Sequence, residues 1–149
     1  FFAAASDLLI ENNALVDKFI GDAVMAFFNA PIPLPNHRQL ALQTAIDLLE
    51  KMGTLDLPFM IGIGLNTGLA LTGNVGSGAV TDYTALGDSV NVTFRLSGLA
   101  KGGEILAGEE TLVCPQEWLP ANYSHEPLSL RVKGREQSVN AYRIYRAAR

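Results

Sequence analysis

The sequence predicts an α+β fold in which helices cover one face of a mostly antiparallel sheet. Several stretches place apolar residues three or four positions apart, a spacing that is typical of amphipathic helices. Other stretches are short apolar runs separated by turn residues, which is typical of β-hairpins. Because the hairpins and helices are interspersed along the chain, we expect pairs of antiparallel strands rather than single strands alternating with helices.

The composition is that of one domain with a substantial core, which we expect to span residues 1–149. A hydrophobic share of 48% also leaves apolar surface for a partner. The formal net charge of -4 disfavours nucleic acid as a partner. Cys114 is the only cysteine, which excludes an internal disulfide bond and fits a reducing, cytoplasmic setting. No apolar run approaches the roughly 18 residues of a membrane span, so we expect no membrane segment in this chain.

The most informative stretch is residues 14–28, where two apolar runs flank Gly21 and Asp22. Gly and Asp tolerate the backbone angles of tight hairpin turns, so the pattern predicts a hairpin with the Asp22 carboxylate at its tip. Lys18 lies in the incoming strand. Charged groups amid this much apolar surface are costly without partners. By default, however, Asp22 serves its own turn and Lys18 is a solvated strand residue.

We expect helices over residues 1–12, 36–53 and 88–100. In the second helix Asn36 provides the N-cap and Gly53 the end. In the third helix Asp88 provides the N-cap. The inward positions expected for the second helix are Ala41, Ala45, Leu48, Leu49 and Met52.

Further strands are expected in the glycine-rich segment 59–76, which we interpret as a hairpin that turns at residues 66–68. Glycine within a strand indicates a bulge or the close approach of another backbone or a ligand. A last hairpin is expected around residues 133–136. Short single strands are expected at residues 80–85 and 104–106.

The helix that begins at Asp88 carries two polar residues, Asn91 and Arg95, between apolar strips. They are four positions apart and project in nearly the same direction, so they should contact something polar. One interpretation is a structural pair that binds a nearby carbonyl or carboxylate, and the other is a ligand site. Lys133 lies in the expected last turn and is by default an exposed basic residue.

Taken together, several stretches resemble the catalytic domain of class III nucleotide cyclases, in particular the bacterial adenylate cyclases. They occur in the family's order and spacing over nearly the whole chain. The resemblance implies a ferredoxin-like α+β fold. The stretches are DKFIGDAVMAFFNAP (17–31), LNTGLALTGNVGS (65–77), LGDSVNVTFRL (86–96), LAKGGEIL (99–106) and RVKGREQSVNAYRI (131–144).

The resemblance implies roles for residues that act on the ribose and the phosphates. Asp22 matches an aspartate that binds Mg²⁺ or Mn²⁺, with two ions per site. Asn91 matches the residue that orients the ribose, and Arg95 matches the one that stabilises charge on the phosphates. Lys133 matches the lysine that binds the triphosphate.

The resemblance also implies a pair of residues that read the purine. Lys18 matches the first of them and can donate to adenine N1, whereas guanylate cyclases typically have Glu there. Thr84 matches the second position, where a bacterial subgroup has Thr. The pair therefore indicates ATP as the substrate. The same subgroup often responds to bicarbonate.

In this family the active site forms between two chains of a head-to-tail homodimer. Asp22 would come from one chain and the remaining site residues from the other, so Lys18 and Asp22 would serve opposite sites. The family's first strand, with its other metal aspartate, would lie upstream of Phe1. We therefore interpret the chain as a fragment, inactive alone, with upstream regulatory domains.

The predicted function is that of an adenylate cyclase catalytic domain, which converts ATP to 3′,5′-cyclic AMP and pyrophosphate. Two alternatives stay open. One is a guanylate or promiscuous nucleotide cyclase. The other is a cyclase-like module that binds nucleotide or dimerises without catalysis.

Overall fold

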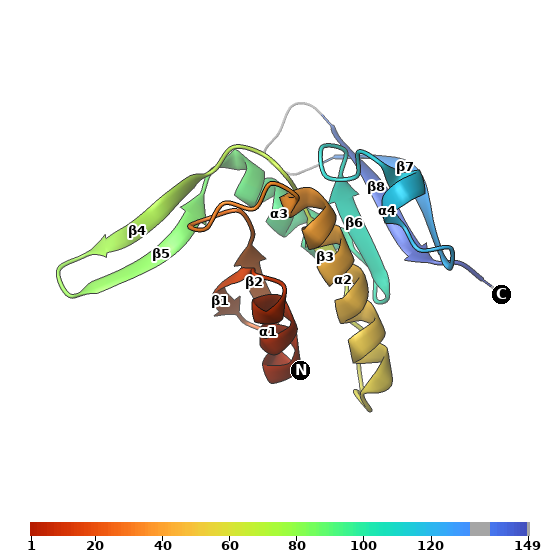
Figure 1. Cartoon of the computed structure of the whole chain (residues 1–149), viewed down its shortest axis with the longest axis horizontal. Helices are drawn as coiled ribbons and strands as arrows, with labels where there is room; N and C mark the ends of the chain where they lie inside the picture. The colour runs from red at the N-terminus through yellow and green to blue at the C-terminus, as the bar shows by residue number, and fades with distance from the viewer. Residues whose placement is uncertain (132–137, 149) are drawn as a thin grey trace.

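The computed structural model of the chain describes residues 1–131 and 138–148, apart from the side chains of residues 80 and 81. Helices and strands are mixed along the chain (Figure 1). The helices are α1 (Phe2–Glu11), α2 (His37–Thr54), α3 (Asp88–Leu99) and α4 (Pro115–Trp118). The strands are β1 (Leu15–Ile20), β2 (Ala23–Phe27), β3 (Ile63–Leu65), β4 (Leu71–Ser77), β5 (Val80–Leu86), β6 (Glu104–Gly108), β7 (Tyr123–Leu130) and β8 (Val139–Arg146).

The strands form one central sheet and two hairpins. The central sheet has the order β3-β6-β8-β7, and its β3–β6 pair is parallel while the other two pairs are antiparallel. Strands β1 and β2 form one antiparallel hairpin, and β4 and β5 form the other. The β4–β5 hairpin extends away from the body of the molecule as a long arm (Figure 1). The predicted α+β class with mostly antiparallel pairing is confirmed.

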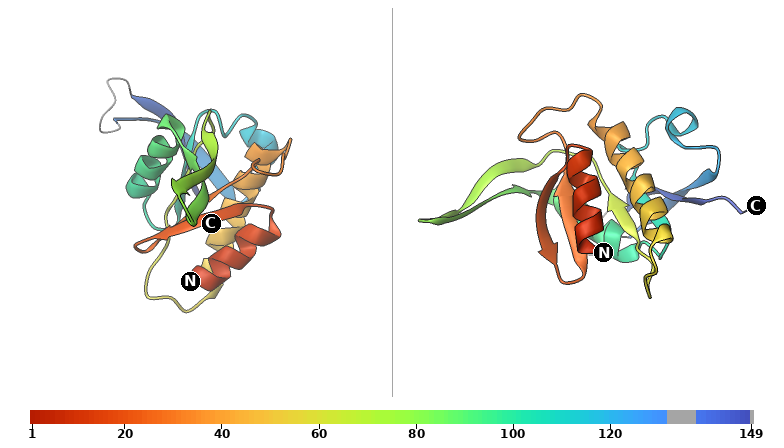
Figure 2. Two further views of the ribbon diagram at one scale, coloured as in Figure 1. Left: turned by 90° about the vertical axis from the view of Figure 1, so that its left-hand side faces the viewer. Right: turned by 60° about the horizontal axis from the view of Figure 1, so that its bottom comes forward.

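The core lies on both faces of the central sheet, because neighbouring residues of a strand point to opposite faces. On one face Ile105 and Ala107 of β6 pack against α2. On the other face Leu106 packs against Val92 and Leu96 of α3. The prediction that helices cover one face only is therefore wrong, since α2 and α3 lie on opposite sides (Figure 2).

The predicted hairpin at residues 14–28 is confirmed. Its two-residue turn is Gly21-Asp22, and Gly21 has a φ of +59°. A positive φ at the first turn position is the pattern of a type II′ turn, in which glycine is favoured.

The three predicted helices are confirmed as α1, α2 and α3, with three differences in detail. Helix α2 continues past Gly53, its predicted end, to Thr54, and its C-cap is Leu55. Gly87 rather than Asp88 is the N-cap of α3. Helix α2 buries Ala45 and Met52 as expected, but it also buries Leu42 and Ile46. The buried arc is wider because α1 contacts α2 from one side and the central sheet contacts it from another.

The predicted hairpin at residues 59–76 is wrong. Strand β3 pairs in parallel with β6, and β4 pairs instead with β5. The reason is the packing of β3 on α3, where a Cβ atom on Gly64 would overlap the backbone of Ser97. The side chain of Asn66 donates a hydrogen bond to the carbonyl of Ser89, 3.1 Å away, so the expected turn residue anchors the chain to α3.

The predicted last hairpin is confirmed in its pairing, since β7 and β8 are antiparallel neighbours. Its turn, with Lys133, lies outside the described residues. Within the described part of the chain, no helix is both long enough and apolar enough to cross a membrane.

Candidate functional site

The predicted purine-reading residues, Lys18 and Thr84, lie close together because Asp17 connects them. The Thr84 hydroxyl Oγ1 donates a hydrogen bond to the Asp17 carboxylate oxygen Oδ2. The other carboxylate oxygen, Oδ1, lies 3.8 Å from the Lys18 ammonium nitrogen. The structure therefore joins a residue of β5 to two consecutive residues of β1.

A β-bulge in β1 explains how neighbouring residues can approach each other in this way. In the β1–β2 ladder Val16 pairs with Ala26 and Lys18 pairs with Met25, so Asp17 is an extra residue without an opposite partner. In a regular strand two consecutive side chains point to opposite faces, whereas a bulge redirects one of them. Bulges are common beside active sites for this reason.

The three residues differ strongly in exposure, which separates their possible roles. The Asp17 side chain is 1% exposed and Thr84 is 4% exposed. The Lys18 side chain is 46% exposed, so its ammonium group keeps donors available to a ligand. A second contact between the same segments, the stacking of Phe27 on Tyr83 at 6.1 Å between ring centroids, holds the β1–β2 hairpin against β5.

Asn91 and Arg95 project from α3 on its exposed side, while Val92 and Leu96 face the core. Among the described residues neither side chain makes a hydrogen bond or an ion pair. The interpretation as a structural pair that binds a nearby carbonyl or carboxylate thus has no support in the described residues. Both polar groups are available to a ligand, and their predicted roles stay predictions.

Asp22 lies at the tip of the β1–β2 hairpin and is exposed. The described residues contain no group of three His, Cys, Asp or Glu side chains that could hold a metal ion. The site in which Asp22 supplies one metal ligand stays a prediction. Such a site is compatible with Mg²⁺, which one or two carboxylates commonly bind together with substrate phosphates and water. Lys133 lies outside the described residues.

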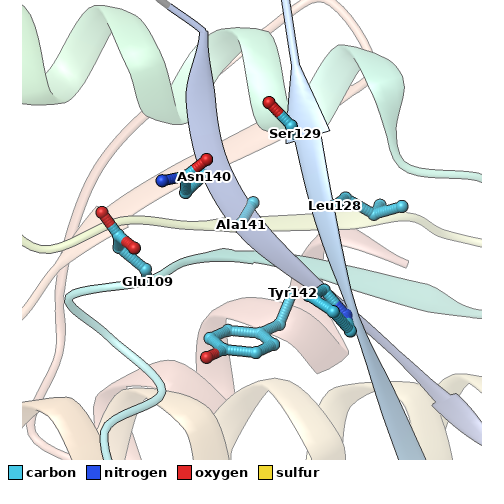
Figure 3. A pocket seen from close by; sticks show the side chains of 7 residues that line it. Glu109, Leu128, Ser129, Asn140, Ala141 and Tyr142 are labelled. Atoms are coloured by element: carbon cyan, nitrogen blue, oxygen red, sulfur yellow. The ribbon is translucent and has the colours of Figure 1, made fainter.

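A shallow pocket of about 330 Å³ lies elsewhere, over β7 and β8 (Figure 3). Its lining includes Glu109, Ser129 and Asn140 but none of the predicted site residues that the structure describes. The pocket therefore adds nothing to the candidate site at β1, β5 and α3.

Asp17 is the residue that sequence reasoning missed. It stands within the stretch at residues 17–31, but no role was predicted for it. In a regular strand a residue next to Lys18 would point to the opposite face. The signal available in the sequence was a second charged residue beside Lys18 in an apolar strand.

Comparison with known proteins identifies the family. A family model described as the adenylate and guanylate cyclase catalytic domain matches residues 3–145. An adenylate cyclase of Anabaena cylindrica is 32% identical over 158 residues, a match that covers 97% of this chain and 30% of the relative. Adenylate cyclase 1 of Rhizobium meliloti (strain 1021) is 29% identical over 155 residues, covering 97% of this chain and 23% of the relative. The chain thus spans less than a third of these two relatives.

Solved structures agree with this family. The adenylyl cyclase CyaB from P. aeruginosa is similar with a TM-score of 0.85 and 27% identity, covering 99% of this chain and 80% of that one. The catalytic core of a rhodopsin-guanylyl cyclase with converted specificity, in complex with ATPalphaS, is similar with a TM-score of 0.78 and 25% identity. That match covers 98% of this chain and 79% of the other. The chain belongs to the family of class III adenylate and guanylate cyclase catalytic domains.

Proposed function

We propose that this chain is the catalytic part of an adenylate cyclase, which converts ATP to 3′,5′-cyclic AMP and pyrophosphate. The observation that carries the proposal is the meeting of Lys18 with Thr84 through Asp17. Two of the similar proteins are themselves named adenylate cyclases, which agrees with this substrate.

The chemistry of Lys18 favours adenine over guanine. An ammonium group only donates hydrogen bonds. Adenine N1 accepts a hydrogen bond, whereas guanine carries a hydrogen on N1. A half-exposed Lys18 is therefore suited to adenine and opposes guanine. A site built to pair with one pattern of donors and acceptors discriminates strongly against the opposite pattern.

In the proposed reaction the ribose 3′-oxygen attacks the α-phosphorus of ATP, and the bond to the pyrophosphate oxygen breaks. Asn91 orients the ribose so that the 3′-oxygen lies in line with the leaving group. Arg95 stabilises the negative charge that develops on the phosphate oxygens, and Lys133 binds the triphosphate. Asn91 and Arg95 suit these roles because both are exposed and neither is engaged by another described residue.

Asp22 would hold the metal ions of this reaction, Mg²⁺ or Mn²⁺, two per site. Bound ions of this kind neutralise the triphosphate and make the 3′-hydroxyl a better nucleophile. Asp22 fits the role because its carboxylate is a hard oxygen ligand at an exposed turn. Its place at the tip of a two-residue turn allows the carboxylate to reach into a site completed by other groups.

The proposed assembly is a head-to-tail homodimer in which Asp22 of one chain approaches the purine, ribose and phosphate residues of the other. The β4–β5 arm supports it, because Leu71, the first residue of β4, is 75% exposed, and Leu69, just before the arm, is 96% exposed. Leu71 also lies opposite Leu86, another exposed apolar residue, in the arm's ladder. Exposed apolar surface of this kind is typical of a protein interface.

The test is a competition assay on the full-length protein, supplied with ATP and GTP together and with Mg²⁺ or Mn²⁺. We expect cyclic AMP as the main product. Lys18→Glu combined with Thr84→Cys should shift the product toward cyclic GMP, and an unchanged ratio would contradict the purine-reading roles. Comparable amounts of both products from the wild type would assign a promiscuous cyclase. Nucleotide binding without either product would assign a non-catalytic module.

A further inference from the structure

We propose that Asp17 sets the purine specificity of this site by fixing the direction of the Thr84 hydroxyl hydrogen. The inference rests on the proposed function, because it concerns how the same site distinguishes ATP from GTP. Asp17 would act as a positioning residue, since its side chain is 1% exposed and a bound base would meet Lys18 and Thr84 instead.

The argument begins with the donors and acceptors of a threonine hydroxyl, which has one hydrogen to donate and two lone pairs that accept. A free hydroxyl rotates to suit its partner and therefore tolerates either a donor or an acceptor on the base. In this structure Thr84 Oγ1 donates its one hydrogen to Asp17 Oδ2. Toward a ligand, the hydroxyl oxygen of Thr84 can therefore only accept a hydrogen bond.

That remaining capacity matches adenine. The exocyclic amino group of adenine donates, whereas the corresponding O6 of guanine accepts. An acceptor at Thr84 and a donor at Lys18 are therefore complementary to the amino group and N1 of adenine. Guanine would place its O6 acceptor against the acceptor of Thr84 and its N1–H donor against the donor of Lys18. Asp17 thereby turns an ambiguous hydroxyl into a group that selects one base.

The surroundings of Asp17 keep it in this role. The bulge in β1 directs its carboxylate toward Thr84, and its second oxygen, Oδ1, makes no hydrogen bond within the described residues. Oδ1 instead lies 3.8 Å from the Lys18 ammonium nitrogen, so the positive charge lies on that side of the carboxylate. One oxygen of the carboxylate thus faces Lys18 while the other accepts from Thr84.

The variant that tests the proposal is Asp17→Asn, which keeps the shape but changes one acceptor into a donor. The positive charge of Lys18 favours the amide oxygen on its own side, which leaves the amide NH₂ toward Thr84. Thr84 would then accept from Asn and be free to donate to guanine O6. We expect the ratio of kcat/KM for ATP to that for GTP to fall about 10-fold or more in the full-length protein. An unchanged ratio would overturn the proposal.

Thr84→Val separates a route through Thr84 from a general loss of structure. Val has nearly the same shape but no hydroxyl, so Asp17→Asn added to Thr84→Val should change the substrate ratio less than about twofold. If Asp17→Asn lowered the substrate ratio equally in the wild type and in Thr84→Val, the proposal would be overturned, because Asp17 would then not act through the Thr84 hydroxyl. A purely structural role would lower the melting temperature in both backgrounds and leave the ratio unchanged.

A second measurement needs no Asp17 variant and so does not depend on that variant folding. Purine riboside triphosphate lacks the exocyclic amino group of ATP. The wild type should use it about 10-fold less well than ATP, and Thr84→Val should remove that difference. If the wild type used ATP and purine riboside triphosphate equally well, the inference about Asp17 would be overturned, but the proposed cyclase function would not. Failure of the wild type to convert ATP at all would overturn the proposed function itself.

Discussion

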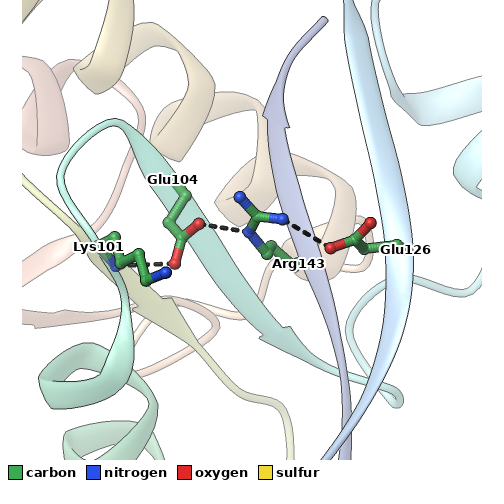
Figure 4. Close-up of polar contacts among 4 residues, drawn as sticks. All are labelled: Lys101, Glu104, Glu126 and Arg143. Atoms are coloured by element: carbon green, nitrogen blue, oxygen red, sulfur yellow. Dashed lines mark hydrogen bonds and ion pairs between the residues drawn. The ribbon is translucent and has the colours of Figure 1, made fainter.

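The carboxylate of Glu104 is almost completely buried, and its neighbours keep it charged (Figure 4). Its Oε2 accepts a hydrogen bond from Arg143 Nε at 2.6 Å, and its Oε1 accepts one from the backbone N–H of Lys101 at 2.8 Å. Arg143 also donates to Glu126 at 2.6 Å. A single arginine of β8 thus links carboxylates on the two strands beside it, β6 and β7.

These contacts make the free energy of unfolding depend on pH in the acidic range. Burial alone would raise the pKa of Glu104, but the hydrogen bond and charge of Arg143 and the bond from Lys101 outweigh it and lower the pKa below 4.5. A carboxyl group whose pKa is lower in the folded state than in the unfolded state stabilises the fold at pH values above its unfolded-state pKa. This stabilisation is lost as the pH falls through the folded-state pKa. We expect the free energy of unfolding to decrease as pH falls below 4.5. Glu104→Gln should show a smaller decrease in urea titrations over this range.

The same cluster predicts an unequal effect of two arginine substitutions. Arg143→Met would leave the buried Glu104 carboxylate without its charged partner, which should lower the free energy of unfolding. Arg146→Met is the matched control, because Arg146 pairs with Glu50 at 3.6 Å and both side chains are exposed. Exposed pairs contribute about 0–1 kcal/mol. Equal effects in chemical denaturation would contradict the role assigned to Glu104.

At the scale of elements, the central contact is between strand β3 and helix α3. It requires a glycine at position 64, since a Cβ atom there would overlap the backbone of Ser97. Backbone cannot move aside as a flexible side chain can, so the helix itself would have to shift. Because α3 carries Asn91 and Arg95, this contact also determines where those two residues lie relative to the sheet.

Two alanine substitutions should therefore differ in their effect on stability. Gly64→Ala should destabilise the fold by about 1–3 kcal/mol through overpacking. Gly98→Ala lies in the same helix as Ser97 but meets open space. It should be neutral or stabilise by up to about 1 kcal/mol, because alanine is the better helix former. Thermal unfolding followed by circular dichroism measures both, and a tolerated Gly64→Ala would contradict the close packing.

For the whole molecule, the notable feature is that the projecting β4–β5 arm carries exposed apolar residues. The body packs its core on both faces of the central sheet. The arm projects from the body (Figure 1), and its paired residues Leu71 and Leu86 are exposed. A two-stranded hairpin alone is marginally stable in water. In the proposed homodimer a second chain would cover this apolar surface.

The prediction at this scale concerns association. Leu71→Glu should raise the dissociation constant of the proposed dimer about 10-fold or more, because a charge would replace apolar surface at the interface. Ile10→Glu is the control, since Ile10 is an exposed apolar residue of α1 away from the arm. Sedimentation of the full-length protein at several concentrations measures the constant. Identical constants for both variants would contradict an interface on the arm.

The sequence by itself determined the local elements. The Gly21-Asp22 turn and the three- and four-residue spacing of the helices depend on neighbouring residues only, and each of these elements is confirmed. The stretches that resemble class III cyclases were also readable without coordinates, and the family is confirmed over residues 3–145. Of the candidate site, Lys18, Thr84, Asn91 and Arg95 were named from the sequence, whereas the contact between Asp17 and Thr84 could not be.

Tertiary structure alone decided which distant segments meet. The parallel pairing of β3 with β6, in place of the predicted hairpin, depends on how closely Gly64 lets β3 approach α3. The contact between Asp17 and Thr84 joins residues 67 positions apart and needs a bulge that no local pattern predicted. Lys18, a charged residue in an apolar strand, lies beside its own neighbour Asp17. The physical reason is that a bulge reverses the alternation of side chains on which reading a strand from sequence depends.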